Sequence, residues 1–177
     1  ALFGGGGYGT SYKMRNTVNA YDNSLVRTTA TTLNTARSGL AATTISNYAI
    51  FAGGQTAKST YTAVTDAYNT SLTQSTPTSL SNARSGLAAT TVGNYALFAG
   101  GYQGSVNNII GTVDAYNTSL TRTIPDALNI TRYHCSATTV GNYAFLNCYN
   151  LEAVTLPQGL KTIGKNSFST CQALAEI

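Results

Sequence analysis

The sequence predicts an all-β protein built from repeats, and three observations support this prediction. The tripeptide Ala1-Leu2-Phe3 returns three times, at intervals of 48, 47 and 48 residues, as Ala49-Ile50-Phe51, Ala96-Leu97-Phe98 and Ala144-Phe145-Leu146. Each period holds short β-branched and apolar runs separated by glycine, asparagine and serine, which is typical of strands and turns. Only 9% of the 177 residues are charged, whereas about 25% is usual for soluble domains.

One complete period, residues 84–130, shows how the elements are expected to follow one another. A β-branched run without helical spacing leads into Gly93-Asn94, a pair that tolerates positive φ and closes hairpins. Pro125 ends the last run, because proline cannot donate to a strand ladder. The predicted strands are residues 87–92, 95–99, 112–116 and 120–123. Four short antiparallel strands in 47 residues is the size of one propeller blade.

The order of residue types within the period resembles the kelch repeat over about residues 1–143. An arginine, a β-branched strand, Gly-Asn, an apolar strand, a diglycine and Val-Asp-Ala-Tyr follow one another. The diglycines are Gly5-Gly6, Gly53-Gly54 and Gly100-Gly101. The resemblance implies a β-propeller of four-stranded antiparallel blades. Kelch blades usually have a tryptophan after the tyrosine, and this sequence has none, so leucines are expected to supply that packing: Leu72, Leu80, Leu120 and Leu128.

The blades can be counted along the chain. Residues 37–82 and 84–130 form complete repeats, 1–35 hold the last three strands of another, and 132–143 hold a lone first strand. Three blades are too few for a known propeller, which has about four to eight. Two interpretations remain open. Either the chain is an excerpt of a longer protein, or copies associate through their open blade edges.

The last segment, residues 144–177, follows a different period. Three residues recur 23 positions later: Phe145, Cys148 and Leu151 return as Phe168, Cys171 and Leu174. With the intervening leucine, proline and isoleucine-glycine, this order resembles the BspA-like leucine-rich repeat. The resemblance implies the start of a solenoid, of which about three repeats are needed for stability.

The candidate ligand-binding residues lie in the segments that follow each diglycine. These segments vary between periods while the strands barely change, and propellers bind through such loops. Tyrosine rings and amide side chains suit sugars or protein surfaces. The candidates are Tyr8, Tyr12, Lys13, Arg15, Lys58, Tyr61, Tyr102, Gln103, Asn107 and Asn108. The alternative interpretation is that these are solvated loops without functional constraint.

A second candidate is a ring formed by Arg37, Arg84 and Arg132, each at the start of a predicted first strand. The kelch resemblance implies that arginines near such positions can hold acidic peptides, and a guanidinium suits carboxylates. The alternative is structural, with each arginine tying neighbouring blades together through backbone carbonyl groups.

Residues for catalysis or metal binding are scarce. The single histidine, His134, adjoins Cys135, and we place this pair where other periods have Ser38-Gly39 and Ser85-Gly86. A structural zinc site needs four ligands, so we predict no metal site. With one histidine and six scattered carboxylates, we also predict no enzyme and no cofactor. Cys148 and Cys171 occupy equivalent turns of the last segment, either as buried thiols or as a disulfide.

The sequence therefore predicts a non-enzymatic scaffold for adhesion or recognition, with glycans or host surface proteins as partners. The resemblance implies an exposed location, at a microbial cell surface or on a phage particle, and no signal peptide is visible. The net charge of +4 is spread too evenly for nucleic acid, and no apolar run reaches the roughly 20 residues of a membrane span. The alternatives are an assembly protein that joins copies into a ring or fibre, and a glycan-acting propeller enzyme.

Overall fold

The computed structural model describes residues 1–8, 13–105 and 107–139. It divides the chain into two units, Ala1–Thr138 and Thr139–Ile177. The all-β prediction is confirmed for the described residues, which form antiparallel strands and no helix. The predicted leucine-rich segment, residues 144–177, lies outside the described residues, as does residue 12.

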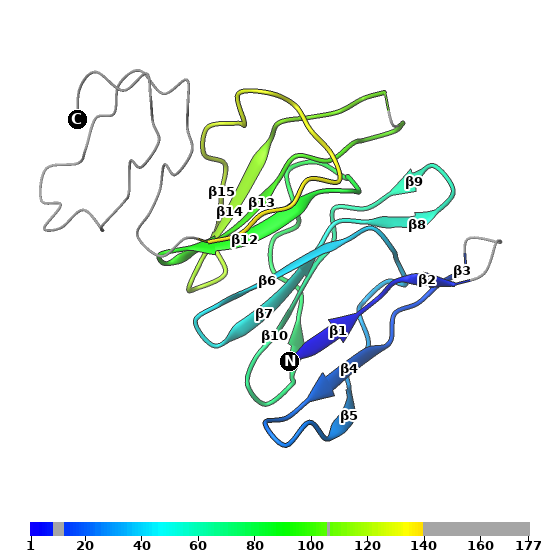
Figure 1. Cartoon of the computed structure of the whole chain (residues 1–177), viewed down its shortest axis with the longest axis vertical. Helices are drawn as coiled ribbons and strands as arrows, with labels where there is room; N and C mark the ends of the chain where they lie inside the picture. The colour runs from blue at the N-terminus through cyan, green and yellow to red at the C-terminus, as the bar shows by residue number, and fades with distance from the viewer. Residues whose placement is uncertain (9–12, 106, 140–177) are drawn as a thin grey trace, which may run out of the picture. The chain divides into compact units, whose positions relative to one another are not determined.

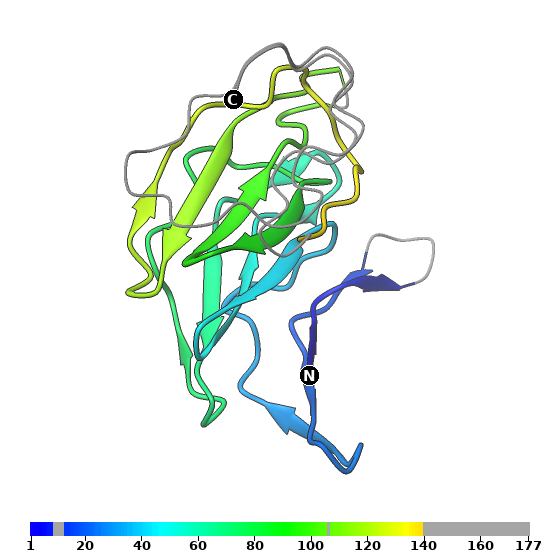
Figure 2. The same cartoon turned by 60° about the vertical axis from the view of Figure 1, so that its left-hand side comes forward.

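Three sheets follow one another along the first unit, coloured from blue to green in Figure 1 and seen from another side in Figure 2. The first, in the order β1-β4-β5, contains β1 (Leu2–Gly4), β4 (Val18–Tyr21) and β5 (Arg27–Ala30). The second, β11-β10-β7-β6, contains β6 (Ala41–Ile45), β7 (Tyr48–Ala52), β10 (Thr65–Tyr68) and β11 (Gln74–Ser75). The third, β12-β13-β14-β15, contains β12 (Ala88–Val92), β13 (Tyr95–Ala99), β14 (Val113–Asn117) and β15 (Arg122–Thr123).

The third sheet follows the strand prediction closely: β12 begins one residue later than predicted, β14 is shifted by one residue, and the largest difference is at the last strand. β12 and β13 pair antiparallel from Ala88 opposite Ala99 to Val92 opposite Tyr95, across the predicted two-residue turn. The fourth strand begins at Arg122 rather than at residue 120. The reason is a side-chain turn, because the Asn117 amide oxygen accepts the backbone N–H groups of residues 119 and 121.

The diglycines join each repeat to the next. The N–H of Gly54 donates to the carbonyl oxygen of Arg84 at 2.8 Å, and a Cβ added to Gly53 would lie 2.8 Å from that oxygen. The same N–H bond joins Gly6 to Arg37 at 2.9 Å and Gly101 to Arg132 at 2.8 Å. A side chain at the first glycine would therefore push neighbouring repeats apart, which is the physical reason for this motif.

Aromatic pairs fill the space between successive sheets. Phe51 and Tyr68 meet edge to face with ring centroids 5.9 Å apart, and they pack against Val18 and Leu33 from the first repeat. Phe98 and Tyr116 repeat this arrangement at 5.9 Å against a second apolar cluster. Each cluster thus combines side chains from two repeats, so neither sheet buries its apolar face alone.

Leucines take part in this packing, as the missing tryptophan led us to expect. Leu80 is buried within the second cluster, and Leu120 packs half-buried against it. Leu72 packs against the first cluster, and Leu128 is half-buried. The equivalent Leu25 is 80% exposed, so the turn leucine is half-buried only where a preceding sheet covers it.

Tyr68 ties the second sheet to the chain segment that precedes it. Its hydroxyl donates to the carbonyl oxygen of Thr31 at 2.9 Å, and the residue is only 1% exposed. Burial and, secondly, the negative charge of Asp66 raise the pKa of Tyr68 to about 12. The hydroxyl of Tyr116 likewise donates to Thr78 at 2.7 Å, and burial raises its pKa. The fold therefore favours the neutral form of both tyrosines.

We expect the protein to lose stability as the pH rises from about 10 to about 12. An unfolded tyrosine ionises near pH 10, whereas folded Tyr68 keeps its proton to about pH 12. The stabilisation is complete below pH 10 and is lost as the pH passes through the folded pKa. Urea unfolding on either side of pH 10 measures this loss. Tyr68→Phe should show a shallower decline, and an unchanged slope would contradict the assignment.

Candidate functional site

The variable segments after the diglycines form short ribbons that follow one another along one side of the repeats (Figure 1). The first ribbon pairs β2 (Gly7–Tyr8) with β3 (Lys13–Met14), and the second pairs β8 (Gln55–Ala57) with β9 (Thr60–Tyr61). In the third segment a single bridge joins Tyr102 to Ile109. β3 contacts β8, so the first two ribbons are neighbours. We call the described residues of these three segments, 7–8 and 13–15, 55–61, and 102–105 and 107–110, the ribbon surface.

The first ribbon brings three predicted residues together around one ring. The Cζ atom of Arg15 lies 4.0 Å from the centroid of the Tyr8 ring, and Lys13 Nζ lies 5.9 Å from it. Tyr8 is 46% exposed, and both cations are exposed. Neither cation forms an ion pair with a described residue. A guanidinium over an aromatic face is held electrostatically while its N–H groups stay available to a ligand.

The second and third segments meet in an aromatic cluster centred on Tyr102. Tyr61, Tyr133 and His134 each lie edge-on to Tyr102, with ring centroids 5.4, 5.6 and 5.8 Å away. Tyr102 is only 8% exposed, Tyr61 is half-buried, and Tyr133 is 40% exposed. The buried ring therefore positions two outer tyrosines that solvent can reach.

The other predicted ligand residues are more scattered. Lys58 is exposed in the turn between β8 and β9, and Asn107 and Asn108 are exposed in the third segment. Gln103 is half-buried, and its backbone N–H donates to the carbonyl oxygen of Asn108 at 3.0 Å. Tyr12 lies outside the described residues. The ribbon surface therefore gathers part of the predicted set.

Tyr133 and His134 join the cluster although the sequence analysis did not place them beside the ribbons. Residue 133 has the same position in the period as Ser38 and Ser85, which form bridges with Gln55 and Tyr102. Because that position lies beside the segment after the diglycine, the tyrosine at position 133 indicated an aromatic side chain next to the ribbons. Position 133 lies outside the variable segments downstream of the diglycines, from which the candidate residues were drawn.

The register assigned to His134 and Cys135 is wrong by one residue. His134 has a φ of 48°, matching Gly39 at 63° and Gly86 at 64°. The N–H of His134 donates to Gly86 at 2.7 Å, and the N–H of Gly86 donates to Gly39 at 3.0 Å. Tyr133-His134, not His134-Cys135, therefore stands where the earlier repeats have Ser-Gly. Cys135 is a half-buried free thiol, and the described residues contain no cluster of three metal-ligating side chains.

The arginines predicted as a ring divide into two buried residues and one exposed residue. Arg37 and Arg84 are fully buried and pair with Asp66 and Asp114 at 2.7 and 2.8 Å. Their Nη2 atoms also donate to the carbonyl oxygens of Phe51 and Phe98, at 3.2 and 3.0 Å. Burial lowers the pKa of Arg84, and Asp114 opposes that shift. Arg132 is exposed and donates to Ile130 at 3.2 Å, so the three do not present a shared cationic ring.

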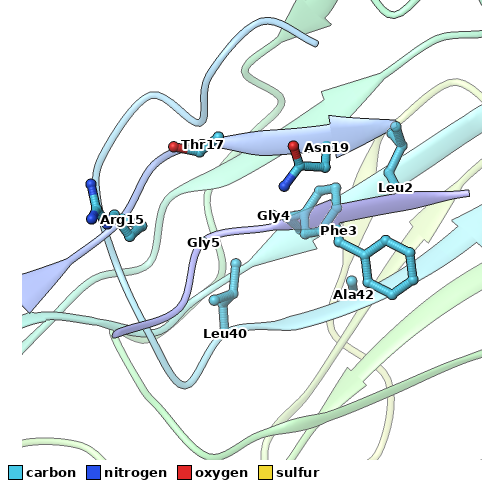
Figure 3. A pocket seen from close by; sticks show the side chains of 10 residues that line it. Leu2, Phe3, Gly4, Gly5, Arg15, Thr17, Asn19, Leu40 and Ala42 are labelled. Atoms are coloured by element: carbon cyan, nitrogen blue, oxygen red, sulfur yellow. The ribbon is translucent and has the colours of Figure 1, made fainter. Parts of the chain in front are cut away.

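A cavity of about 560 Å³ lies beside the edge strand β1. Figure 3 shows Leu2, Phe3, Thr17, Asn19 and Arg15 on the first repeat, with Leu40 and Ala42 from the second repeat nearby. β6 and β12 lie beside β7 and β13 in the complete sheets, whereas the described residues provide no such neighbour for β1. The cavity therefore lies beside the open edge of the first sheet.

Comparison with known proteins gives a family match for one segment and a likeness in fold. Residues 126–177 match the BspA type leucine rich repeat region, which supports the predicted leucine-rich segment and begins before residue 144. No curated protein matches the chain. The solved structure of YjhT is similar to it, with a TM-score of 0.60 and 14% identity, over 72% of this chain and 43% of the YjhT chain. This chain thus spans less than half of that protein, and the likeness concerns the fold alone.

The described residues also contain no helix long and apolar enough to cross a membrane.

Proposed function

We propose that this chain is a non-enzymatic scaffold for adhesion or recognition that binds glycans or surface proteins through the ribbon surface. The observation that carries the proposal is the gathering of the exposed Tyr8, the half-buried Tyr61 and unpaired cations on ribbons that vary while the sheets beneath them repeat. The BspA-type match supports a surface repeat protein. We place it at a microbial cell surface or on a phage particle. The residue order supports kelch-like propeller blades as the scaffold.

Three of the four acidic residues that the structure describes have structural partners, and this placement favours binding over catalysis. Asp66 and Asp114 are buried in ion pairs with arginine. Asp22 accepts the backbone N–H groups of residues 24 and 26, at 2.9 Å each, and so closes a turn. Glycan hydrolysis usually needs a pair of carboxyl groups facing one substrate. These three carboxylates instead have structural partners within their own repeats.

A glycan array tests this function directly. The array is probed with the full chain and with variants in which an exposed pair, Lys58-Ser59 in the second ribbon or Asn107-Asn108 in the third segment, is replaced by Gly-Ser. We expect at least one class of glycan to bind, and we expect a turn replacement to remove the binding. Melting temperatures show that each variant remains folded. If no turn replacement changes the binding of a detected ligand, recognition through the ribbon surface is wrong.

A second candidate function, assembly of copies, is favoured by the cavity beside β1. Phe3 lies on that strand and is 62% exposed, and an edge strand presents unpaired N–H and C=O groups to another chain. A first strand from a second copy would fit there as β6 fits beside β7. Light scattering over a wide concentration range tests this, and a constant monomer mass would contradict it.

A further inference from the structure

We propose that the glycan bound by the ribbon surface carries acidic groups, sulfate or carboxylate, and that Arg15 is their main contact. This inference rests on the proposed function and names its ligand class. The three segments of the ribbon surface contain Lys13, Arg15 and Lys58 and no aspartate or glutamate. All three cations are exposed, and none pairs with a described carboxylate. In a chain with so few charges, this is a local excess of positive charge.

The fold itself does not require an arginine at position 15. The N–H of Arg15 donates to the carbonyl oxygen of Gly6 at 2.8 Å, and its own carbonyl accepts from Arg37 at 3.0 Å. The N–H of Thr62 donates in the same way to Gly54 at 3.0 Å, and that of Ile110 to Gly101 at 2.9 Å. Positions 15, 62 and 110 therefore make the same backbone hydrogen bond with three different side chains. The fold does not require a guanidinium at position 15.

The setting of Arg15 prepares it to bind an anion. Its backbone is fixed on both sides by these hydrogen bonds, and its guanidinium lies on the Tyr8 ring. An ordered guanidinium loses little side-chain entropy on binding and can grip sulfate or carboxylate with two parallel hydrogen bonds. Arg37 and Arg84 cannot play this part, because they are buried and already paired.

The neighbouring segments supply what a sugar needs beyond its charge. β3 contacts β8, and Lys58 stands in the turn that follows β8. Tyr61 and Tyr133 flank the buried Tyr102, and tyrosine rings offer flat faces on which sugars stack. Three cations interspersed with tyrosines fit a glycan better than nucleic acid, which requires a dense basic stripe.

The test compares four immobilised probes: heparin for sulfate, polygalacturonate for carboxylate, dextran as a neutral glycan and oligothymidylate as a nucleic acid. We expect one or both acidic glycans to bind, more weakly as salt rises. The variant Arg15→Thr copies the residue found at position 62 and should weaken binding about tenfold or more. Arg27→Thr removes an exposed cation from β5, outside the ribbon surface, and should leave binding unchanged.

Each outcome decides between the two proposals. Equal binding of dextran, equal loss in both arginine variants, or tighter binding of oligothymidylate would overturn the acidic-glycan inference. Binding of dextran alone, removed by the turn replacements, would overturn the inference while the proposed function stands. If Arg15→Thr lowers the melting temperature, the binding of the acidic glycans is measured with Lys13→Thr instead. Unchanged binding in that variant would count against the inference.

Discussion

Replacing Arg84 by methionine is expected to lower the free energy of unfolding by about 3–5 kcal/mol, because Asp114 would remain buried without its closest cation. The Arg84 and Asp114 side chains are fully enclosed, 2.8 Å apart. Arg122 also approaches Asp114, but at 3.3 Å and from a partly exposed position. It compensates only in part for the missing charge.

Urea unfolding measures this loss, and Arg132→Met provides the matched control. Arg132 has the same position in its repeat but is exposed, so its replacement should cost less than about 0.5 kcal/mol. A third variant, Arg84→Met with Asp114→Leu, removes both charges and should recover part of the loss. Similar losses in Arg84→Met and Arg132→Met would show that the buried pair does not stabilise the fold.

The sequence predicted the periodic elements well because their signals are local. The hairpin across Gly93-Asn94 and the diglycines are set by neighbouring residues, so they could be identified without knowing the tertiary fold. The kelch-like propeller stays a prediction, since the described sheets are open and no comparison identifies that repeat.

The pairing of Arg37 with Asp66 was harder to predict, because Arg37 lies in the segment before β6 and Asp66 lies on β10, far along the chain. A signal was nonetheless present in the sequence. Asp66 and Asp114 occur in repeats that begin with an arginine, whereas the first repeat has Asn19 at that position. The charge pattern between repeats thus indicated an internal pair rather than a ligand contact.

The aromatic cluster and the contact of Arg15 with Tyr8 could not be predicted from the sequence of a single repeat. Tyr61, Tyr102 and Tyr133 belong to three successive repeats, and they meet only because neighbouring repeats stack in register. The contact of Arg15 with Tyr8 depends on the pairing of β2 with β3. Such contacts depend on the register between segments, which sequence spacing alone does not specify.

Gly53→Ala is expected to destabilise the protein by about 2–5 kcal/mol, through left-handed backbone strain and a steric clash. Gly53 has a φ of 70°, and its added methyl group would lie 2.8 Å from the Arg84 carbonyl oxygen and 3.1 Å from the Leu87 side chain. The carbonyl belongs to the backbone of the next repeat, so relieving the clash means separating two repeats.

Gly93→Ala is the control that separates the steric clash from the backbone strain, because it introduces the strain alone. Gly93 has a φ of 52° but no atom within 4 Å of an added methyl group, so it should lose only about 1 kcal/mol from backbone strain. Hydrogen exchange at the Gly54 N–H, which bonds to Arg84 at 2.8 Å, reports the contact itself. We expect Gly53→Ala to speed this exchange far more than Gly93→Ala does. Equal losses of stability and equal exchange rates would show that the diglycine is a turn signal only, and that it does not hold the repeats together.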